Sequence, residues 1–133
     1  MRYMLMMHAP RGKTGEYQAT NWAPDDLAAH IAFMHALNKD LTAAGELVSA
    51  QGLATPGEAR IVRVGSDGVP AVTDGPYPET KEFLAGFWIV DVDRTERAYE
   101  IAARASAAPG PGGKPLGIPL EVRQVMSAPS MEA

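Results

Sequence analysis

The sequence predicts an α+β fold, a ferredoxin-like sandwich in which two helices cover one face of a sheet. Segments with strand and helix periodicity follow one another in the order strand-helix-strand-strand-helix-strand, and a hairpin is inserted before the third main strand. A chain of 133 residues is long enough to bury one core. We therefore expect a single domain over residues 1–126 and a flexible C-terminal tail at 127–133.

Composition excludes several classes of function. The net charge of −4 and the isoelectric point near 5.3 argue against a nucleic-acid or anionic-membrane partner, which normally requires a basic surface. The chain has no cysteine, and its three histidines are dispersed without ligand spacing, so no metal site and no cofactor is predicted. The apolar run at 1–7 is too short for a signal peptide or membrane span, and we expect a cytoplasmic protein.

The N-terminal part reads as a strand followed by a long loop. Residues 2–8 are apolar at both parities, so this strand needs cover on both faces of the sheet. Residues 9–23 are polar and read as a loop. Arg11, Tyr17 and Trp22 are its possible ligand contacts, and the alternative is a solvated loop with Trp22 packed as an anchor.

The first helix is predicted from Pro24 to Gly45. Proline suits the first helical position, and glycine suits the residue after a helix. The apolar positions recur at helical spacing, at Leu27, Ile31, Met34, Leu37 and Leu41. His30 and Asn38 fall within this apolar arc. They either satisfy hydrogen bonds inside the core or point into a pocket, whereas His35 is expected at the surface.

The middle of the chain contains three predicted strand regions. A short strand covers 47–50, and residues 60–64 and 70–73 form a hairpin around a glycine-rich turn. Residues 87–92 are apolar at both parities and read as a central strand. Gly86 precedes it and allows another backbone to approach closely.

The C-terminal part contains the second helix and the last strand. Residues 93–96 have capping-box spacing, with Asp93 as the N-cap, and open a helix. Its inward face is small, with Ala98, Ile101, Ala102 and Ala105, so the helix should lie close to the sheet. The Gly- and Pro-rich segment 107–119 is predicted to be a linker or lid rather than a phosphate cradle, because proline lacks the amide donor. Residues 120–126 form the last strand.

Two helices can cover only one face of the sheet, yet the first and third main strands are apolar on both. The uncovered face therefore needs a partner. We expect a homodimer in which the open sheet faces of two chains meet by two-fold symmetry.

The segment 72–82 is the candidate site. Asp74-Gly75-Pro76 predicts a rigid turn, and Tyr77, Glu79, Lys81 and Glu82 follow it directly. This run resembles the signature of the DGPF subgroup of YCII-related proteins, which usually have Phe at the position of Tyr77. Further matching stretches are Arg2–Leu5, Ala44–Leu47, Gln51–Leu53, Gly86–Trp88 and Glu121–Arg123.

The resemblance implies a ferredoxin-like protomer that forms a dimeric α+β barrel. Many relatives are encoded beside extracytoplasmic-function sigma factors, which implies a signalling or stress context. Members of the wider YCII group have a proposed His–Asp pair suggestive of acid–base catalysis. Asp74 is the residue that the resemblance carries over, through the DGPF motif itself; the histidine role is not assigned to His30 or His8.

The first functional hypothesis is a cofactor-independent enzyme that performs acid–base chemistry on a small polar organic molecule. Asp74 would act as a base or orient a histidine, and His30 would be its proton-transfer partner. Lys81 would hold anionic charge on the substrate. Further candidate substrate contacts are Glu79, Tyr77, Trp88 and His8. The alternative for these residues is structural: Asp74 caps its turn, and the charged residues after it form exposed ion pairs.

The second hypothesis is a non-catalytic small-molecule-binding or regulatory module whose output goes to a protein partner. It predicts that an apolar pocket matters more than the ionisable groups, with Trp88, Tyr77, Phe83 and methionines as the lining. Seven methionines fit an adaptable pocket, although they fit an ordinary core equally well.

Overall fold

The centre of the molecule is a four-stranded sheet in which every neighbouring pair is antiparallel. The structure is a computed structural model that describes residues 1–10, 22–75 and 82–127. The strands stand in the order β2-β5-β1-β6. Their bounds are β1 Arg2–Pro10, β2 Leu47–Gly52, β5 Glu82–Asp91 and β6 Leu120–Gln124. This order, with a helix after β1 and another after β5, is compatible with the predicted ferredoxin-like fold.

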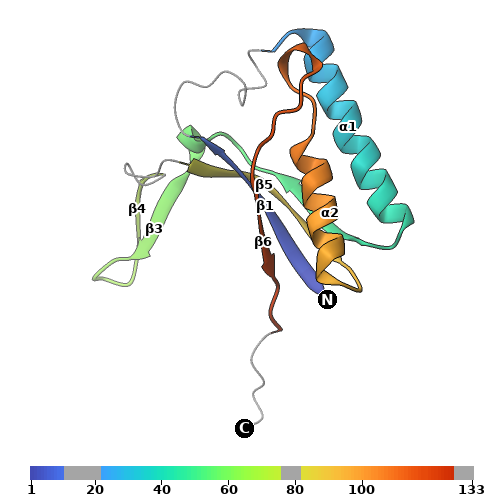
Figure 1. Cartoon of the computed structure of the whole chain (residues 1–133). Helices are drawn as coiled ribbons and strands as arrows, with labels where there is room; N and C mark the ends of the chain where they lie inside the picture. The colour runs from blue at the N-terminus through green and yellow to red at the C-terminus, as the bar shows by residue number, and fades with distance from the viewer. Residues whose placement is uncertain (11–21, 76–81, 128–133) are drawn as a thin grey trace.

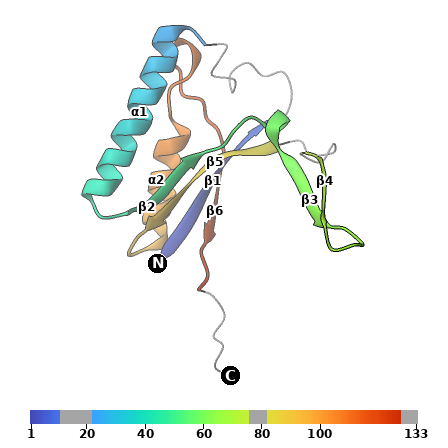
Figure 2. The ribbon, with the colours of Figure 1, turned by 180° about the vertical axis from the view of Figure 1, so that it is seen from behind.

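Both helices lie on the same face of this sheet, as Figures 1 and 2 show from opposite sides. They are α1, Pro24–Ala43, and α2, Thr95–Ser106. The strands β3, Arg60–Val64, and β4, Pro70–Asp74, form a separate two-stranded sheet. This hairpin stands away from the four-stranded sheet, on the side opposite the helices. Two short 3₁₀ turns complete the described elements, η3 at Pro56–Glu58 and η4 at Pro111–Gly113.

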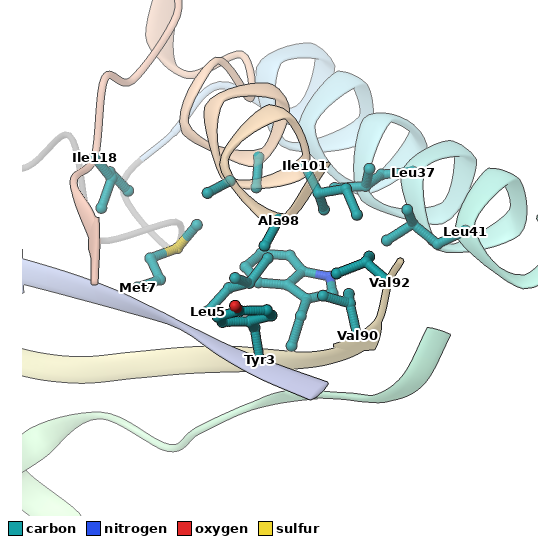
Figure 3. Packing of buried hydrophobic residues seen from close by; sticks show 13 residues of the cluster. Tyr3, Leu5, Met7, Leu37, Leu41, Val90, Val92, Ala98, Ile101 and Ile118 are labelled. Atoms are coloured by element: carbon teal, nitrogen blue, oxygen red, sulfur yellow. The ribbon is translucent and has the colours of Figure 1, made fainter. Parts of the chain in front are cut away.

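The core lies between the sheet and the two helices (Figure 3). Along β1 the buried side chains alternate with half-buried ones, so that Leu5 and Met7 face the helices while Met4 and Met6 face away. Trp88 and Val90 of β5 continue the same inward layer. The helices contribute Leu37, Leu41, Ala98, Ile101, Ala102 and Ala105. Burial of each large aliphatic side chain stabilises the fold by about 1.5–3 kcal/mol.

The end of α1 is fixed by glycine, as the sequence predicts. Gly45 has a φ of 72°, in the left-handed region where other residues are strained. The Glu46 amide donates to the Leu41 carbonyl oxygen, and the Gly45 amide donates to that of Thr42. This pair of bonds is a Schellman motif, which satisfies carbonyls that would otherwise lack partners. The chain then turns directly into β2.

The face that α1 presents to the sheet differs slightly from the predicted one. Leu37 and Leu41 are buried, but Ile31 is 45% exposed. His30 takes the inward position instead, followed by Met34 one turn later. The inward face of α1 therefore carries the polar side chain of His30 where the predicted face carries the apolar side chain of Ile31.

The capping box predicted at Asp93 is wrong. The N-cap of α2 is Arg94, and no side chain caps it. The side chains of this segment make tertiary contacts instead: the Thr95 hydroxyl hydrogen-bonds the Tyr3 hydroxyl at 2.6 Å, and the Arg97 guanidinium pairs with Glu46 at 2.8 Å. Contacts to β1 and to the turn before β2 replace the local cap.

The central strand is longer than its apolar run. β5 begins at Glu82 rather than at 87, because Phe83 and Leu84 pair with Ala9 and His8 of β1. Ala85 is an extra residue in this register, which places a bulge beside Gly86. The last strand, β6, is shorter than predicted, since it ends at Gln124 and not at 126.

Gly86 confirms the predicted close approach of two backbones. A Cβ at this position would lie 2.8 Å from the Gln51 carbonyl oxygen, whereas a Cβ on its cross-strand partner Gly52 would meet nothing within 4 Å. We predict that Gly86→Ala lowers the free energy of unfolding by about 1–3 kcal/mol because β2 must move. Urea unfolding measures the change. Gly52→Ala is the matched control, and equal losses in the two variants would contradict this reading of Gly86.

The Glu46–Arg97 ion pair should make stability depend on pH. The hydrogen bond that Arg97 donates to Glu46 holds the pKa of the Glu46 carboxyl below the ordinary value of 4.5. A carboxyl pKa that is lower in the folded state stabilises the fold above 4.5, and the contribution is lost as the pH falls through the folded value. We predict that Arg97→Met costs about 1 kcal/mol at pH 7, since the pair is partly screened by solvent.

Urea unfolding at pH 7 and at pH 3 tests this linkage. The difference between wild type and Arg97→Met should shrink at the lower pH. Lys39→Met, a substitution of an exposed residue on α1, serves as the charge-matched control. A difference that stays constant with pH would show that Arg97 acts through packing alone.

Candidate functional site

A cavity of about 320 Å³ lies between the middle of α1 and the sheet. Its floor consists of small residues on three neighbouring strands, Ala9, Ala50, Ala85 and Gly86. The remaining lining residues are Met7, Trp22, His30, Met34, Asn38, Gln51, Gly52, Phe87, Trp88, Leu116 and Ile118. The cavity exists because small side chains on the strands leave space that α1 does not fill.

Three residues of α1 form one side of the cavity. His30, Met34 and Asn38 are four residues apart, which places them on one face of the helix at successive turns. The same helix packs into the core through Leu37 and Leu41. Helix α1 therefore contributes both to the core and to the lining of the cavity.

His30 is held by a hydrogen bond to the segment after α2. Its Nδ1 lies 2.9 Å from the Pro109 carbonyl oxygen. A carbonyl only accepts, so Nδ1 carries the hydrogen in this contact and a neutral ring leaves its lone pair on Nε2. The Trp22 ring packs edge-on against the imidazole, with ring centroids 5.1 Å apart. His30 thus satisfies one nitrogen on backbone and lines a pocket as well, so both predicted alternatives hold in part.

Trp88 and Asn38 are joined across the cavity wall. The Trp88 Nε1–H donates to Asn38 Oδ1 at 2.9 Å. Since indole is only a donor, the amide must present its oxygen to Trp88, and its NH₂ group points elsewhere. No side-chain polar atom in the described part of the chain is both buried and unpaired. The Asn38 amide nitrogen is therefore accessible at a residue that lines the cavity.

The Gly- and Pro-rich segment 107–119 forms a wall of the cavity. It folds back over the start of α1, where the Gly112 amide donates to Asp26 Oδ2 at 3.1 Å. Leu116 and Ile118 then face the cavity, and Figure 3 shows Ile118 beside Met7 at one end of the core. The segment contains one 3₁₀ turn, η4, and is held at both the helix and the sheet. The sequence predicts a linker or a lid for this segment. Its position beside the cavity, with Leu116 and Ile118 in the lining, fits the lid better than a plain linker.

Asp74 lies apart from this cavity. It is the last residue of β4, its side chain is 97% exposed, and its nearest ionic partner is Arg60 at 3.6 Å. The predicted pairing of Asp74 with His30 is therefore not formed within one chain. The reason is topological, since β4 pairs with β3 in a hairpin that stands off the main sheet.

His8 also lies outside the cavity. Its Nε2 is 3.0 Å from Glu121 Oε1 on β6. His8 alternates with Met7 along β1, so it belongs to the sheet face without helices. His8 is not among the residues that line the cavity.

Several predicted contacts fall outside the described residues. These are Arg11, Tyr17, Tyr77, Glu79 and Lys81. Among the described ones, Trp22, Trp88 and two methionines line the cavity, whereas Phe83 does not.

Sequence reasoning missed the floor and one wall of the cavity. The floor residues are small and carry no chemistry of their own, so nothing in the sequence singles them out. The available signal was small residues at the edges of two predicted strands: Ala50 and Gly52 at the end of 47–50, and Ala85-Gly86 just before 87–92. Only the register, which sets Ala50 opposite Trp88 and Gly52 opposite Gly86, brings them under one helix.

Two other kinds of feature are absent from the described residues, a cluster of metal ligands and a membrane-spanning helix. Among residues 1–10, 22–75 and 82–127, no three His, Asp or Glu side chains gather as metal ligands would. Within those ranges no helix has the length and apolar character to cross a bilayer.

Comparison with known families agrees with the architecture. The model of the YCII-related domain matches residues 1–110, which is most of the chain. The chain belongs to the YCII-related family. The match includes β1, both helices and His30, Asn38 and Trp88, while Leu116, Ile118 and β6 lie beyond it. A search of curated proteins gives no match.

Proposed function

We propose that this YCII-related protein binds a small, largely apolar organic molecule in the cavity under α1. One observation carries the proposal: a cavity of about 320 Å³ is lined by two tryptophans and two methionines and contains a few convergent polar groups. Ligand sites typically combine such apolar walls with a small number of placed donors and acceptors. Methionine and tryptophan also adapt well to varied ligands.

Binding is better supported than catalysis. Acid–base turnover of the predicted kind needs two proton-handling groups, and His30 is the one titratable side chain among the described lining residues. Asp74 is exposed on the hairpin of the same chain. We therefore favour the binding or regulatory module, with His30 as the residue that would handle a proton if a reaction occurs. We also assign this chain to the DGPF subgroup on the basis of its motif. A regulatory output to a protein partner would suit the sigma-factor context that membership of this subgroup implies.

Filling the cavity should abolish binding. Met34→Trp places a large side chain in the cavity, while Ile31→Trp adds the same side chain to the exposed face of α1. The two native tryptophans both line the cavity, so their indole N–H signals in ¹H–¹⁵N NMR spectra report on it directly. With 1-tetralone as the probe, we expect saturable shifts of both native signals in wild type and in Ile31→Trp but not in Met34→Trp. Equal shifts in both variants would place the probe elsewhere.

We also propose that two copies associate through the sheet face without helices, as in a dimeric α+β barrel. The support is the apolar character of this face, where Met4, Met6 and Ile89 are only partly covered by their own chain. Burying such a patch against its copy removes apolar surface from water.

A charge in the middle of this face should dissociate the dimer. Ile89 pairs with Met4 on one side and Ser49 on the other, so Ile89→Glu places a carboxylate in the proposed interface. Light scattering after size exclusion should give twice the chain mass of 14.1 kDa for wild type and the single mass for this variant. Tyr99→Glu, at an exposed position of α2, should remain dimeric. A monomeric wild type would contradict the proposal.

A further inference from the structure

We infer that the ligand of this cavity is a neutral aromatic molecule with a carbonyl-type acceptor at one end and a hydroxyl donor at the other, as in a hydroxyaryl ketone. The inference rests on the proposed binding function and specifies the ligand class. It follows from which polar atoms of α1 are already used by the fold and which remain.

Asn38 supplies a donor. Its Oδ1 accepts the indole hydrogen of Trp88, so this oxygen is occupied. The Nδ2 group has two hydrogens and no partner among the described residues, yet Asn38 lines the cavity. A ligand that leaves this donor unpaired would lose affinity, because a desolvated amide without a partner costs free energy. A carbonyl or ether oxygen on the ligand would pair it.

His30 supplies an acceptor. The bond from Nδ1–H to the Pro109 carbonyl fixes the tautomer, so the neutral ring presents a lone pair at Nε2. Trp22 packs against the same ring and limits its rotation. A ligand hydroxyl could donate to Nε2. The bond to Pro109 therefore positions the histidine for this contact in addition to joining α1 to the segment after α2.

The lining favours a ligand without charge. Within the described chain, no Asp, Glu, Lys or Arg side chain lines the cavity. A carboxylate or ammonium on the ligand would give up part of its hydration and find no countercharge among these described residues. Tryptophan and methionine side chains instead suit the faces and edges of aromatic rings.

The spacing of the polar pair sets the length of the ligand. His30 and Asn38 are eight residues apart on α1, which corresponds to about 12 Å along the helix axis. Met34 lies between them and lines the cavity. A ligand that carries its acceptor and its donor at opposite ends of an aromatic ring system suits two polar groups that are separated along the helix in this way.

Four related probes test this inference on the full-length protein. 6-Hydroxy-1-tetralone has both polar groups, 1-tetralone lacks the hydroxyl, 5,6,7,8-tetrahydro-2-naphthol lacks the carbonyl, and 6-hydroxy-2-naphthoate adds a charge. Dissociation constants come from the shifts of the Trp22 and Trp88 indole signals. We expect 6-hydroxy-1-tetralone to bind most tightly, with a loss of about tenfold for each missing group and a larger loss for the carboxylate.

A matched variant isolates the Asn38 donor. Asn38→Asp keeps an oxygen for the Trp88 indole but replaces the free NH₂ with a second acceptor. It should weaken 6-hydroxy-1-tetralone by about tenfold and 5,6,7,8-tetrahydro-2-naphthol by much less. If the variant does not fold, the probe series on wild type alone decides the question.

The outcomes separate this inference from the proposed function. Equal affinities for the three neutral probes, or tightest binding of the naphthoate, would overturn the ligand class. Binding itself would still stand if Met34→Trp abolished it. If no probe produces saturable shifts, or if Met34→Trp binds them as wild type does, both the ligand class and the cavity site are wrong.

Discussion

The structure depends on how α1 rests on the sheet. The helix packs through Leu37 and Leu41, which are fully buried in the core. On the side that carries His30, Met34 and Asn38 it lies over alanines and a glycine on the strands, and these cannot fill the space below it. The space that remains is a pocket open to the surface, and its shape depends on walls that are held in place.

Two hydrogen bonds hold those walls. His30 joins α1 to the segment after α2 through Pro109, and Asn38 joins α1 to β5 through Trp88. Each bond satisfies a group that would be costly to leave unpaired, and each leaves a second polar atom available at a residue lining the cavity. The interactions that close the cavity thus also determine its chemistry. Asp74, the most recognisable residue of the sequence motif, stands on a different sheet and makes no such contribution within its own chain.

Features set by neighbouring residues could be predicted from the sequence. The order of elements, the end of α1 at Gly45 and the close approach at Gly86 follow from periodicity and from the backbone freedom of glycine. The Asp93 cap was wrong because Thr95 and Arg97 bind distant residues instead. The sequence places His30 on the inward face of its helix, and the enzyme hypothesis pairs it with Asp74, which the fold keeps on a separate hairpin. Pro109 could not be found in this way, since only the fold of 107–119 brings it to α1.

The protonation site of His30 tests the account most directly. In a neutral imidazole free in water the hydrogen resides mainly on Nε2, so a protein must hold it on Nδ1. Long-range ¹H–¹⁵N NMR spectra of the histidine rings distinguish the two tautomers. The account predicts that neutral His30 carries its hydrogen on Nδ1, donated to Pro109, and that added 6-hydroxy-1-tetralone shifts the Nε2 resonance. A hydrogen on Nε2, or a ring unaffected by the probe, would contradict it.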